Sequence, residues 1–358
     1  MRLGVLKEPD DARVAIVPQS VKKFAAAGFE VQVETGAGAG AFYADAAYAE
    51  AGATVVSRSE ILAGADMILG IAPPADAELE ALRAGVFVVA MFNPLGNQAL
   101  VDKLKSLPIK PFSLDRIPRI TIAQSMDILS SQASLAGYKA VLMAANYLPS
   151  YFPMLMTAAG TIPPARVLIL GAGVAGLQAI ATARRLGATV EAFDVRSAVK
   201  EEVESLGAKF VEVEGAREEQ SAGGYAVQQT EDYQRRQRAL IHERASRADV
   251  IITTASIPGR QAPLLIEQAT VEAMRPGSVI VDLAASSGGN CALTQNKQII
   301  QHQGVTIIGD SNLPGGMARD ASILFGNNVL SFLKYVFPGG KPEVDYSTEI
   351  AKGTYFGQ

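Results

Sequence analysis

A polar stretch near the middle of the chain holds the side chains best suited to chemistry. It covers residues 119–132 and reads Arg-Ile-Thr-Ile-Ala-Gln-Ser-Met-Asp-Ile-Leu-Ser-Ser-Gln, with no His, Lys or Cys to transfer a proton. Four of its side chains are candidates for contact with a reacting group: Arg119, Gln124, Asp127 and Ser130. If residues 123–134 are helical, the last three share one face, and the preceding arginine can pair with the aspartate. The pattern suits hydride transfer without a general acid or base. Spacing alone favours a plainer interpretation, a capped and solvated helix face with a surface ion pair.

A glycine-rich turn lies further along the chain. Residues 167–176 read Val-Leu-Ile-Leu-Gly-Ala-Gly-Val-Ala-Gly, which is a strand followed by G-x-G-x-x-G. A helical pattern over 177–186, a strand over 189–193 and an acid at the end of that strand complete a dinucleotide-binding fingerprint. The turn and the N-terminus of its helix offer N–H groups and partial positive charge to a pyrophosphate. We therefore expect a phosphate cradle formed by Gly171, Ala172, Gly173, Val174, Ala175 and Gly176.

The acid at the strand end, Asp194, indicates which nucleotide is bound. Its carboxylate can bind both hydroxyls of a ribose and would repel a 2′-phosphate. The sequence therefore predicts NAD(H) rather than NADP(H), and Arg196 is the one feature that can soften this preference. Ligands also bind at the carboxyl ends of other strands in such sheets. Two further strand ends provide candidate contacts: Thr254, Ala255, Asp282 and Leu283.

Composition and organisation indicate two α/β domains. The chain has 358 residues, a hydrophobic share of 49%, a net charge of −4, one Cys and two His. These values favour large cores and disfavour a nucleic-acid surface, a disulfide and a Cys- or His-based metal site. Strand and helix patterns alternate in both halves, so we predict two doubly wound Rossmann-like domains with a nucleotide cleft between them. The first covers residues 1–130 plus 318–358, closed by a C-terminal helix over 321–337, and the second, NAD(H)-binding domain covers 131–317.

Three other segments bear on this organisation. We expect no targeting segment, and the apolar stretch 135–160 is interrupted by Lys, Asn and Pro, so it predicts a buried connector helix rather than a membrane span. The prolines between 149 and 164 indicate an inter-domain connection. The long polar segment 215–238 is either a functional loop, with Tyr225 docking on a bound nucleotide, or a solvated surface loop.

The residues quoted above resemble the NAD(H)-binding component (domain I, or alpha subunit) of proton-translocating nicotinamide nucleotide transhydrogenase. The resemblance covers essentially the whole chain, and its most specific part is the run from Ala123 to Gln132. It implies nicotinamide contacts from Arg119, Gln124, Asp127 and Ser130, with the glutamine bridging toward the second nucleotide. It further implies adenosine-ribose contacts near Asp194, Val195 and Arg196, and a loop carrying Tyr225 that closes over NAD(H).

The resemblance also implies partners. In this family a hydride passes between NAD(H) on this component and NADP(H) on a separate NADP(H)-binding domain, and a transmembrane domain couples the transfer to proton translocation. A homodimer is implied as well, as is a cytoplasmic location, peripheral on the inner membrane through the partner subunits. The sequence departs from the family pattern at Ile122, Ser286 and Gly315-Gly316, which affects individual contacts. Since the sequence ends before any membrane helix, we expect a separately encoded subunit or a truncation.

Alanine dehydrogenase, the nearest relative in fold, is the main alternative. That enzyme moves a proton as well as a hydride, and it uses a Lys, a His and an Asp beside an early Arg. Arg13 is kept here, whereas Ala72, residues 90–93 and Ser286 stand where the other three are expected. Direct transfer between two nicotinamide rings needs only distance, alignment and a dry site. A non-catalytic NAD-sensing module is the second alternative.

Overall fold

The computed structural model describes residues 1–213, 215 and 230–357. The chain folds into two compact units, one formed by Met1–Gln132 with Pro314–Gln358 and the other by Ala133–Leu313. Each unit is built around a mainly parallel sheet. This confirms the predicted α/β class with two Rossmann-like domains. The domain boundaries predicted from the sequence, at 130/131 and 317/318, differ from these limits by a few residues.

The first unit contains a six-stranded parallel sheet in the order β3-β2-β1-β4-β5-β6. Its strands are β1 (Arg2–Val5), β2 (Glu30–Glu34), β3 (Thr54–Val56), β4 (Met67–Leu69), β5 (Phe87–Ala90) and β6 (Lys110–Ser113). This is the doubly wound order, in which ligands bind at the carboxyl ends of the strands. The short edge strand β3 was not predicted from the sequence.

Helices cover both faces of that sheet, each over its own apolar core. One core includes α1 (Pro18–Ala26), α2 (Asp45–Glu50) and α11 (Ala318–Val336), and the other includes α3 (Arg58–Gly64), α4 (Asp76–Ala81) and α5 (Gln98–Ser106). The short helix α12 (Glu349–Thr354) follows near the C-terminus. Helix α11 packs its Phe332 ring against that of Phe112 on β6, with centroids 6.1 Å apart. Burying such a ring contributes about 1.5–3 kcal/mol, so α11 is an integral part of this unit.

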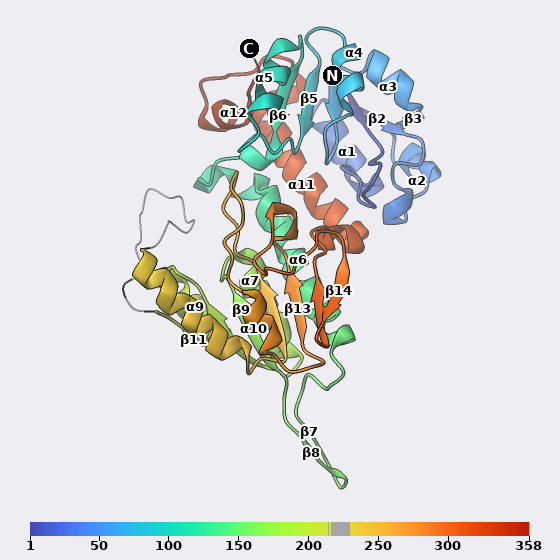
Figure 1. Ribbon diagram of the computed structural model, residues 1–358. Coiled ribbons are helices and arrows are strands. Elements are labelled where there is room, and N and C mark those ends of the chain that lie inside the picture. The colour runs from blue at the N-terminus through green and yellow to red at the C-terminus, as the bar shows by residue number, and fades with distance from the viewer. Residues whose placement is uncertain (214, 216–229, 358) are drawn as a thin grey trace. The chain divides into compact units, whose positions relative to one another are not determined.

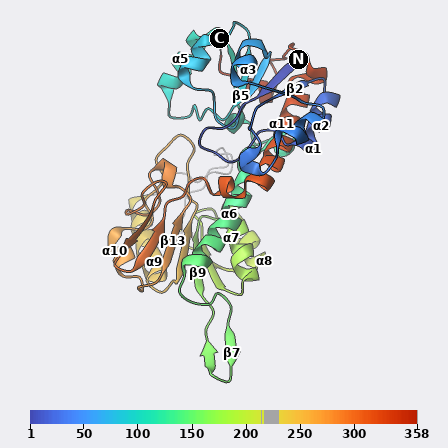
Figure 2. The same cartoon turned by 90° about the vertical axis from the view of Figure 1, so that its right-hand side faces the viewer.

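The second unit has a seven-stranded sheet in the order β11-β10-β9-β12-β13-β15-β14. Its strands are β9 (Arg166–Leu170), β10 (Thr189–Phe193), β11 (Lys209–Val211), β12 (Val250–Thr253), β13 (Val279–Asp282), β14 (Ile299–His302) and β15 (Val305–Ile308). Among the described strands of this sheet, β14, which the sequence did not reveal, is the one that runs antiparallel to its neighbour. Figure 2 shows α7 (Val174–Arg185) and α8 (Lys200–Ser205) on one side of the sheet, and α9 (Glu231–Ala245) and α10 (Gln268–Glu272) on the other.

Two local predictions from the sequence were wrong. The helix expected over 123–134 is a 3-10 helix over Thr121–Met126, followed at Ile128 by the α-helix α6 (Ile128–Tyr147). The proline-rich segment after α6, expected to be a connection, forms an antiparallel hairpin of β7 (Leu155–Thr157) and β8 (Gly160–Ile162). Figure 1 shows this hairpin projecting from the second unit. Among the described helices, none combines the length and the apolar character that a membrane crossing requires.

Candidate nucleotide-binding site

The glycine-rich turn joins β9 to α7, as the fingerprint predicts. Gly171 has φ +104°, a left-handed conformation that favours glycine, and a Cβ there would lie 2.5 Å from Thr254 Oγ1. Gly176 packs so closely on the carbonyl oxygen of Gly171 that a side chain would not fit. Around Gly173, in contrast, a Cβ would meet nothing within 4 Å. The backbone is therefore open to a ligand at Gly173, beside the first N–H groups of α7.

Helix α6 supports this turn through a contact that the sequence gave no sign of. A Cβ at Gly137, within α6, would collide with the backbone of Ala175 in the first turn of α7. The two helices therefore approach each other at backbone distance, which fixes the N-terminus of α7. Val174, the first residue of α7, is 42% exposed, so this end of the helix faces open space.

Asp194 lies at the end of β10, buried, with its carboxylate aimed at the turn. Its Oδ2 accepts the Ala172 N–H at 2.7 Å and Arg196 Nη2 at 2.7 Å, and its Oδ1 accepts Arg196 Nε at 2.9 Å. The bond to Asp194 raises the pKa of the Arg196 guanidinium above its usual value. A ribose that binds this carboxylate must therefore share it with Arg196 or displace it, and the arginine side chain is 26% exposed.

The neighbouring strand ends complete the edge of the sheet. Thr254, just after β12, donates from Oγ1 to the carbonyl of Gly171 at 3.0 Å. Asn290 accepts the Ala255 N–H at 3.1 Å and donates to its carbonyl at 2.9 Å, so this side chain fixes the backbone beside the turn. Sequence reasoning did not select Asn290 as a functional residue. Its place after a glycine pair at a strand's carboxyl end was the available signal.

Asp282 is buried and organises the loop that contains Asn290. Its carboxylate accepts hydrogen bonds from Thr253 Oγ1 at 2.9 Å, Thr294 Oγ1 at 2.7 Å and the Asn290 N–H at 2.7 Å. It also accepts the backbone N–H groups of Ala284 and Cys291. The structure therefore places Asp282 beneath the edge, where it positions the loop, and leaves its neighbour Leu283 partly exposed.

The polar stretch of the first unit forms a turn that is held by buried side chains. Ala123 and Met126 of the 3-10 helix are buried in the core, whereas Arg119 and Gln124 are exposed. Asn328 of α11 holds this turn, donating to the carbonyl of Ser125 at 2.9 Å. The same amide accepts Ser131 Oγ at 2.7 Å. Asn328 thus has a positioning role that sequence reasoning missed.

Asp127 lies between the 3-10 helix Thr121–Met126 and helix α6. Its Oδ1 accepts the Ser130 N–H at 2.9 Å and its Oδ2 accepts Ser130 Oγ at 2.6 Å, so it caps the start of α6. Asp127 and Ser130 are therefore brought together, while the break between helices separates Gln124 from their shared face. The pairing of Arg119 with Asp127 stays a prediction. Ile122, one of the departures from the family pattern, is 55% exposed beside Gln124.

A second polar group in the first unit surrounds Arg13. Arg13 is 6% exposed, and its guanidinium binds Asp11 through Nη2 at 2.6 Å and donates to Gln132 Oε1 at 2.7 Å. Glu8, nearby in the sequence, accepts the backbone N–H groups of Ile71 at 2.6 Å and Ala72 at 3.1 Å. Burial raises the pKa of the Glu8 carboxyl. Arg13 is thus already paired within the fold.

Two predictions concern other residues. Tyr225, with the loop assigned to it, lies outside the described residues. Among those that are described, no group of three or more His, Cys, Asp or Glu side chains is arranged to hold a metal ion.

Comparison with known families covers nearly the whole chain. The family model "Alanine dehydrogenase/PNT, N-terminal domain" matches residues 4–136, and "Alanine dehydrogenase/PNT, C-terminal domain" matches residues 140–356. The chain is 46% identical to the first part of NAD(P) transhydrogenase subunit alpha of Rhodospirillum rubrum, over 98% of this chain and 92% of that protein. It is 41% identical to NAD(P) transhydrogenase subunit alpha of Haemophilus influenzae, over 99% of this chain and 70% of that protein.

Solved structures agree with this placement. A transhydrogenase from Sinorhizobium meliloti superposes with a TM-score of 0.90 at 42% identity, covering 99% of this chain and 98% of that one. An L-alanine dehydrogenase gives a TM-score of 0.77 at 26% identity, covering 93% and 89%. The chain therefore belongs to the alanine dehydrogenase/PNT family, within which it resembles the alpha subunits of NAD(P) transhydrogenase.

Proposed function

We propose that this chain binds NAD(H) and passes a hydride directly between it and NADP(H) held by a separate NADP(H)-binding domain. In the same proposal a transmembrane domain couples the transfer to proton translocation, and the chain lies on the cytoplasmic side of the inner membrane through these partners. The family and the glycine-rich turn support NAD(H) binding. The proposed role in hydride transfer to the partner's NADP(H) rests on the polar turn of the first unit.

The observation that carries the proposal is the exposed side chain of Gln124 on an anchored turn. The buried side chains of Ala123 and Met126 and the hydrogen bond from Asn328 hold the turn in place. An amide can hydrogen-bond a nicotinamide carboxamide but cannot serve as a general acid or base. Asp127, the nearest carboxylate in sequence, has both oxygens engaged by Ser130. This set suits alignment of two rings for hydride transfer.

The adenosine half of NAD(H) is assigned to the second unit. In this assignment the pyrophosphate binds at residues 171–176, and the ribose hydroxyls bind Asp194 beside Val195 and Arg196. Thr254, Ala255 and Leu283 line the adjoining strand ends, and Asp282 acts through the loop it positions. Tyr225 belongs to the closing loop in this proposal.

The experiment follows the hydride itself. The purified chain is mixed with NADH deuterated at C4, NADP⁺ and the NADP(H)-binding domain of a transhydrogenase, and product NADPH is analysed by mass spectrometry. Direct transfer predicts deuterium in NADPH only when both proteins are present, and no loss of label to water. Turnover by the chain alone with L-alanine and NAD⁺ would establish the amino-acid dehydrogenase instead. NADH binding without any transfer to the partner would establish a sensing module.

The surroundings of Arg13 favour hydride transfer to NADP⁺ over oxidation of L-alanine. A substrate carboxylate binds a guanidinium best through a free pair of donors, and here Asp11 and Gln132 already take a donor from each of the three nitrogens of Arg13. We therefore expect no oxidation of L-alanine.

A homodimer is the remaining part of the proposal. The β7–β8 hairpin exposes Met156 (72%), and Met154 (57%) and Tyr151 (52%) just before it are exposed as well. An isolated two-stranded hairpin is marginally stable in water, so an exposed apolar one favours contact with another chain. Sedimentation of the purified chain tests this.

A further inference from the structure

The second unit has a basic cavity at the edge of its sheet opposite the glycine-rich turn. It encloses about 210 Å³ and is lined by Arg166, Val167, Leu168, Thr189, Glu191, Arg244, Arg247 and Ala248. Arg166 and Thr189 begin β9 and β10 and pair with each other across the sheet. Gly171, in contrast, follows the carboxyl end of β9. At about 3.3 Å per residue the two ends of this strand are roughly 15 Å apart, so the cavity is separate from the turn.

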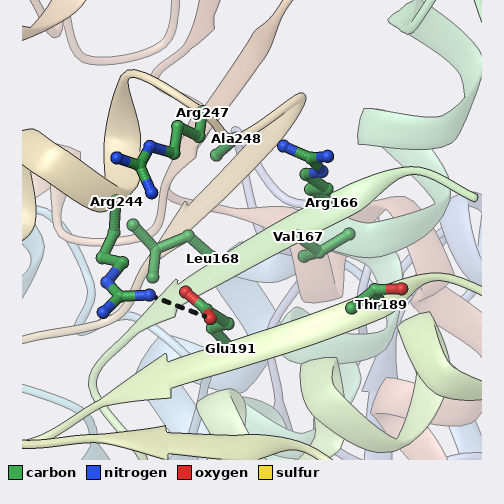
Figure 3. A pocket seen from close by; sticks show the side chains of 8 residues that line it. All are labelled: Arg166, Val167, Leu168, Thr189, Glu191, Arg244, Arg247 and Ala248. Carbon is green, nitrogen blue, oxygen red and sulfur yellow. Dashed lines mark hydrogen bonds and ion pairs between the residues drawn. The ribbon is translucent and has the colours of Figure 1, made fainter.

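The lining carries an excess of positive charge. Three arginines face one carboxylate, that of Glu191, which leaves two positive charges. Figure 3 shows Arg244 and Arg247 on the α9 side of the cavity and Arg166 on β9. Lys209 binds Glu191 from outside the lining at 3.7 Å, and Glu243 binds Arg247 at 3.5 Å, so these two outer charges cancel. A cluster of unbalanced positive charge of this kind attracts a dianion.

The donors of Arg244 are only partly used. Its Nη1 lies 3.3 Å from Glu191 Oε1, whereas its Nε is buried and has no hydrogen-bond partner in the described part of the chain. A guanidinium has only donors, and a buried donor without an acceptor is costly. The edge formed by Nε and Nη2 is the one that grips an oxyanion with two parallel hydrogen bonds.

Arg166 and Arg247 also retain binding capacity. Within the described residues no ion pair or hydrogen bond engages the Arg166 side chain, although its backbone N–H donates to Asp249 Oδ2 at 2.8 Å. The Arg247 pair with Glu243 is between groups that are 63% and 48% exposed, and such a pair is weak. Both guanidinium groups can therefore turn to a ligand at little cost.

We propose that this cavity binds the phosphate group of a small ligand. A phosphate monoester carries about −1.5 to −2 charge at pH 7, which matches the two unbalanced positive charges. A small turn of the Arg244 side chain, which is 27% exposed, would present its Nε–Nη2 edge to the phosphate oxygens, and Arg166 and Arg247 would bind the same group. The volume suits a phosphate with a small substituent rather than a dinucleotide, because pockets for larger ligands reach about 300–1,000 Å³.

Isothermal titration with inorganic phosphate and pyrophosphate tests the site. The full chain is first saturated with NADH, so that the glycine-rich turn is occupied. We expect one saturable phosphate site per chain under these conditions. Loss of phosphate binding when NADH is added would place the ion at the turn and overturn the proposal. Equal affinity for citrate would overturn the assignment to phosphate.

Variants locate the binding. Arg244→Met and Arg166→Met should each weaken phosphate binding roughly tenfold or more, since each removes charge-assisted hydrogen bonds. Arg244→Lys keeps the charge but loses the two-donor edge, so it should weaken binding as well. Arg235→Met is the matched control, because this arginine lies on α9 with its side chain 75% exposed, outside the cavity. NADH affinity and the melting temperature report on folding. Unchanged phosphate affinity in the folded Arg166 and Arg244 variants would overturn the proposal.

Discussion

Replacing Asp194 with alanine tests the nucleotide assignment most directly. The carboxylate accepts the Ala172 N–H at 2.7 Å and the Arg196 guanidinium at 2.7 and 2.9 Å. A bound ribose adds one or two hydrogen bonds to this group, partly at the expense of those from Arg196. The net loss on substitution is therefore about 1–3 kcal/mol, or roughly a 5- to 150-fold weaker affinity for NADH.

The assay is a fluorescence titration of NADH and, in parallel, of NADPH. NADPH should lose less affinity than NADH in the Asp194→Ala protein, because removal of the carboxylate also removes the repulsion of a 2′-phosphate and frees Arg196. Arg196→Ala is the comparison variant: it keeps the carboxylate and removes its competitor, so NADH binding should weaken less than in the Asp194→Ala protein. The ratio of the two affinities thus separates a ribose contact from a general loss of structure.

Folding needs its own control at this position. Asp194 is 8% exposed, and its removal leaves the Ala172 N–H without an acceptor. Asp194→Asn keeps an acceptor oxygen and the side-chain volume, so it should fold when the alanine variant does not. If both variants fold and bind NADH as tightly as the parent chain, Asp194 does not contact the ribose and the reasoning fails.

Four further outcomes are expected. Gln124→Ala should lower the rate of hydride transfer to the partner at least about tenfold while NADH affinity changes little; equal losses in stopped-flow and titration would refute the bridging role. Asn328→Ala removes two hydrogen bonds from the polar turn, so chemical denaturation should show a free energy of unfolding lower by about 1–2 kcal/mol. An unchanged free energy of unfolding would show that the turn does not need these two bonds. Burial raises the pKa of Glu8 above 4.5, so the folded state binds its proton more tightly than the unfolded state does. The free energy of unfolding should therefore fall, relative to that of a Glu8→Gln variant, as pH rises from 4.5 toward neutrality. A difference between the two proteins that does not change with pH would contradict this. Met156→Glu should shift sedimentation toward the monomer, whereas a chain that remains dimeric would exclude the hairpin from the interface.

Much of the fold follows from hydrophobic patterning. Strands such as β9 and β12 are short apolar runs bounded by turn residues, and their burial on both faces is what a parallel sheet requires. The β7–β8 hairpin was not predictable in this way, because its residues face solvent and so carry no burial pattern. The prolines near it indicated a break in the helix and gave no information on the structure beyond that break.

The candidate site also contains residues that the sequence predicts and residues that it does not. The glycine positions were predictable because each has a steric reason that is local in sequence, as at Gly171. Asn328 and Gly137 were not, since their roles depend on contacts with segments distant in the chain or in another helix. The polar turn was assigned the wrong helix type because Asp127 was read as a helical residue, although aspartate also favours the N-cap position it occupies here.

The partners of Arg13 show why the presence of a residue does not imply a particular function. A buried guanidinium must have acceptors, and an enzyme that binds a substrate carboxylate can leave part of that requirement to its ligand. Here Asp11 supplies a carboxylate with oxygens 2.6 to 3.1 Å from the guanidinium nitrogens, and Gln132 supplies an amide oxygen at 2.7 Å. Gln132 in turn donates to the carbonyl of Ala321, which ties the group to α11. Because the fold itself provides these acceptors, the positive charge at this position is explained by stability, and the Arg13 signal in the sequence carries no weight for amino-acid oxidation.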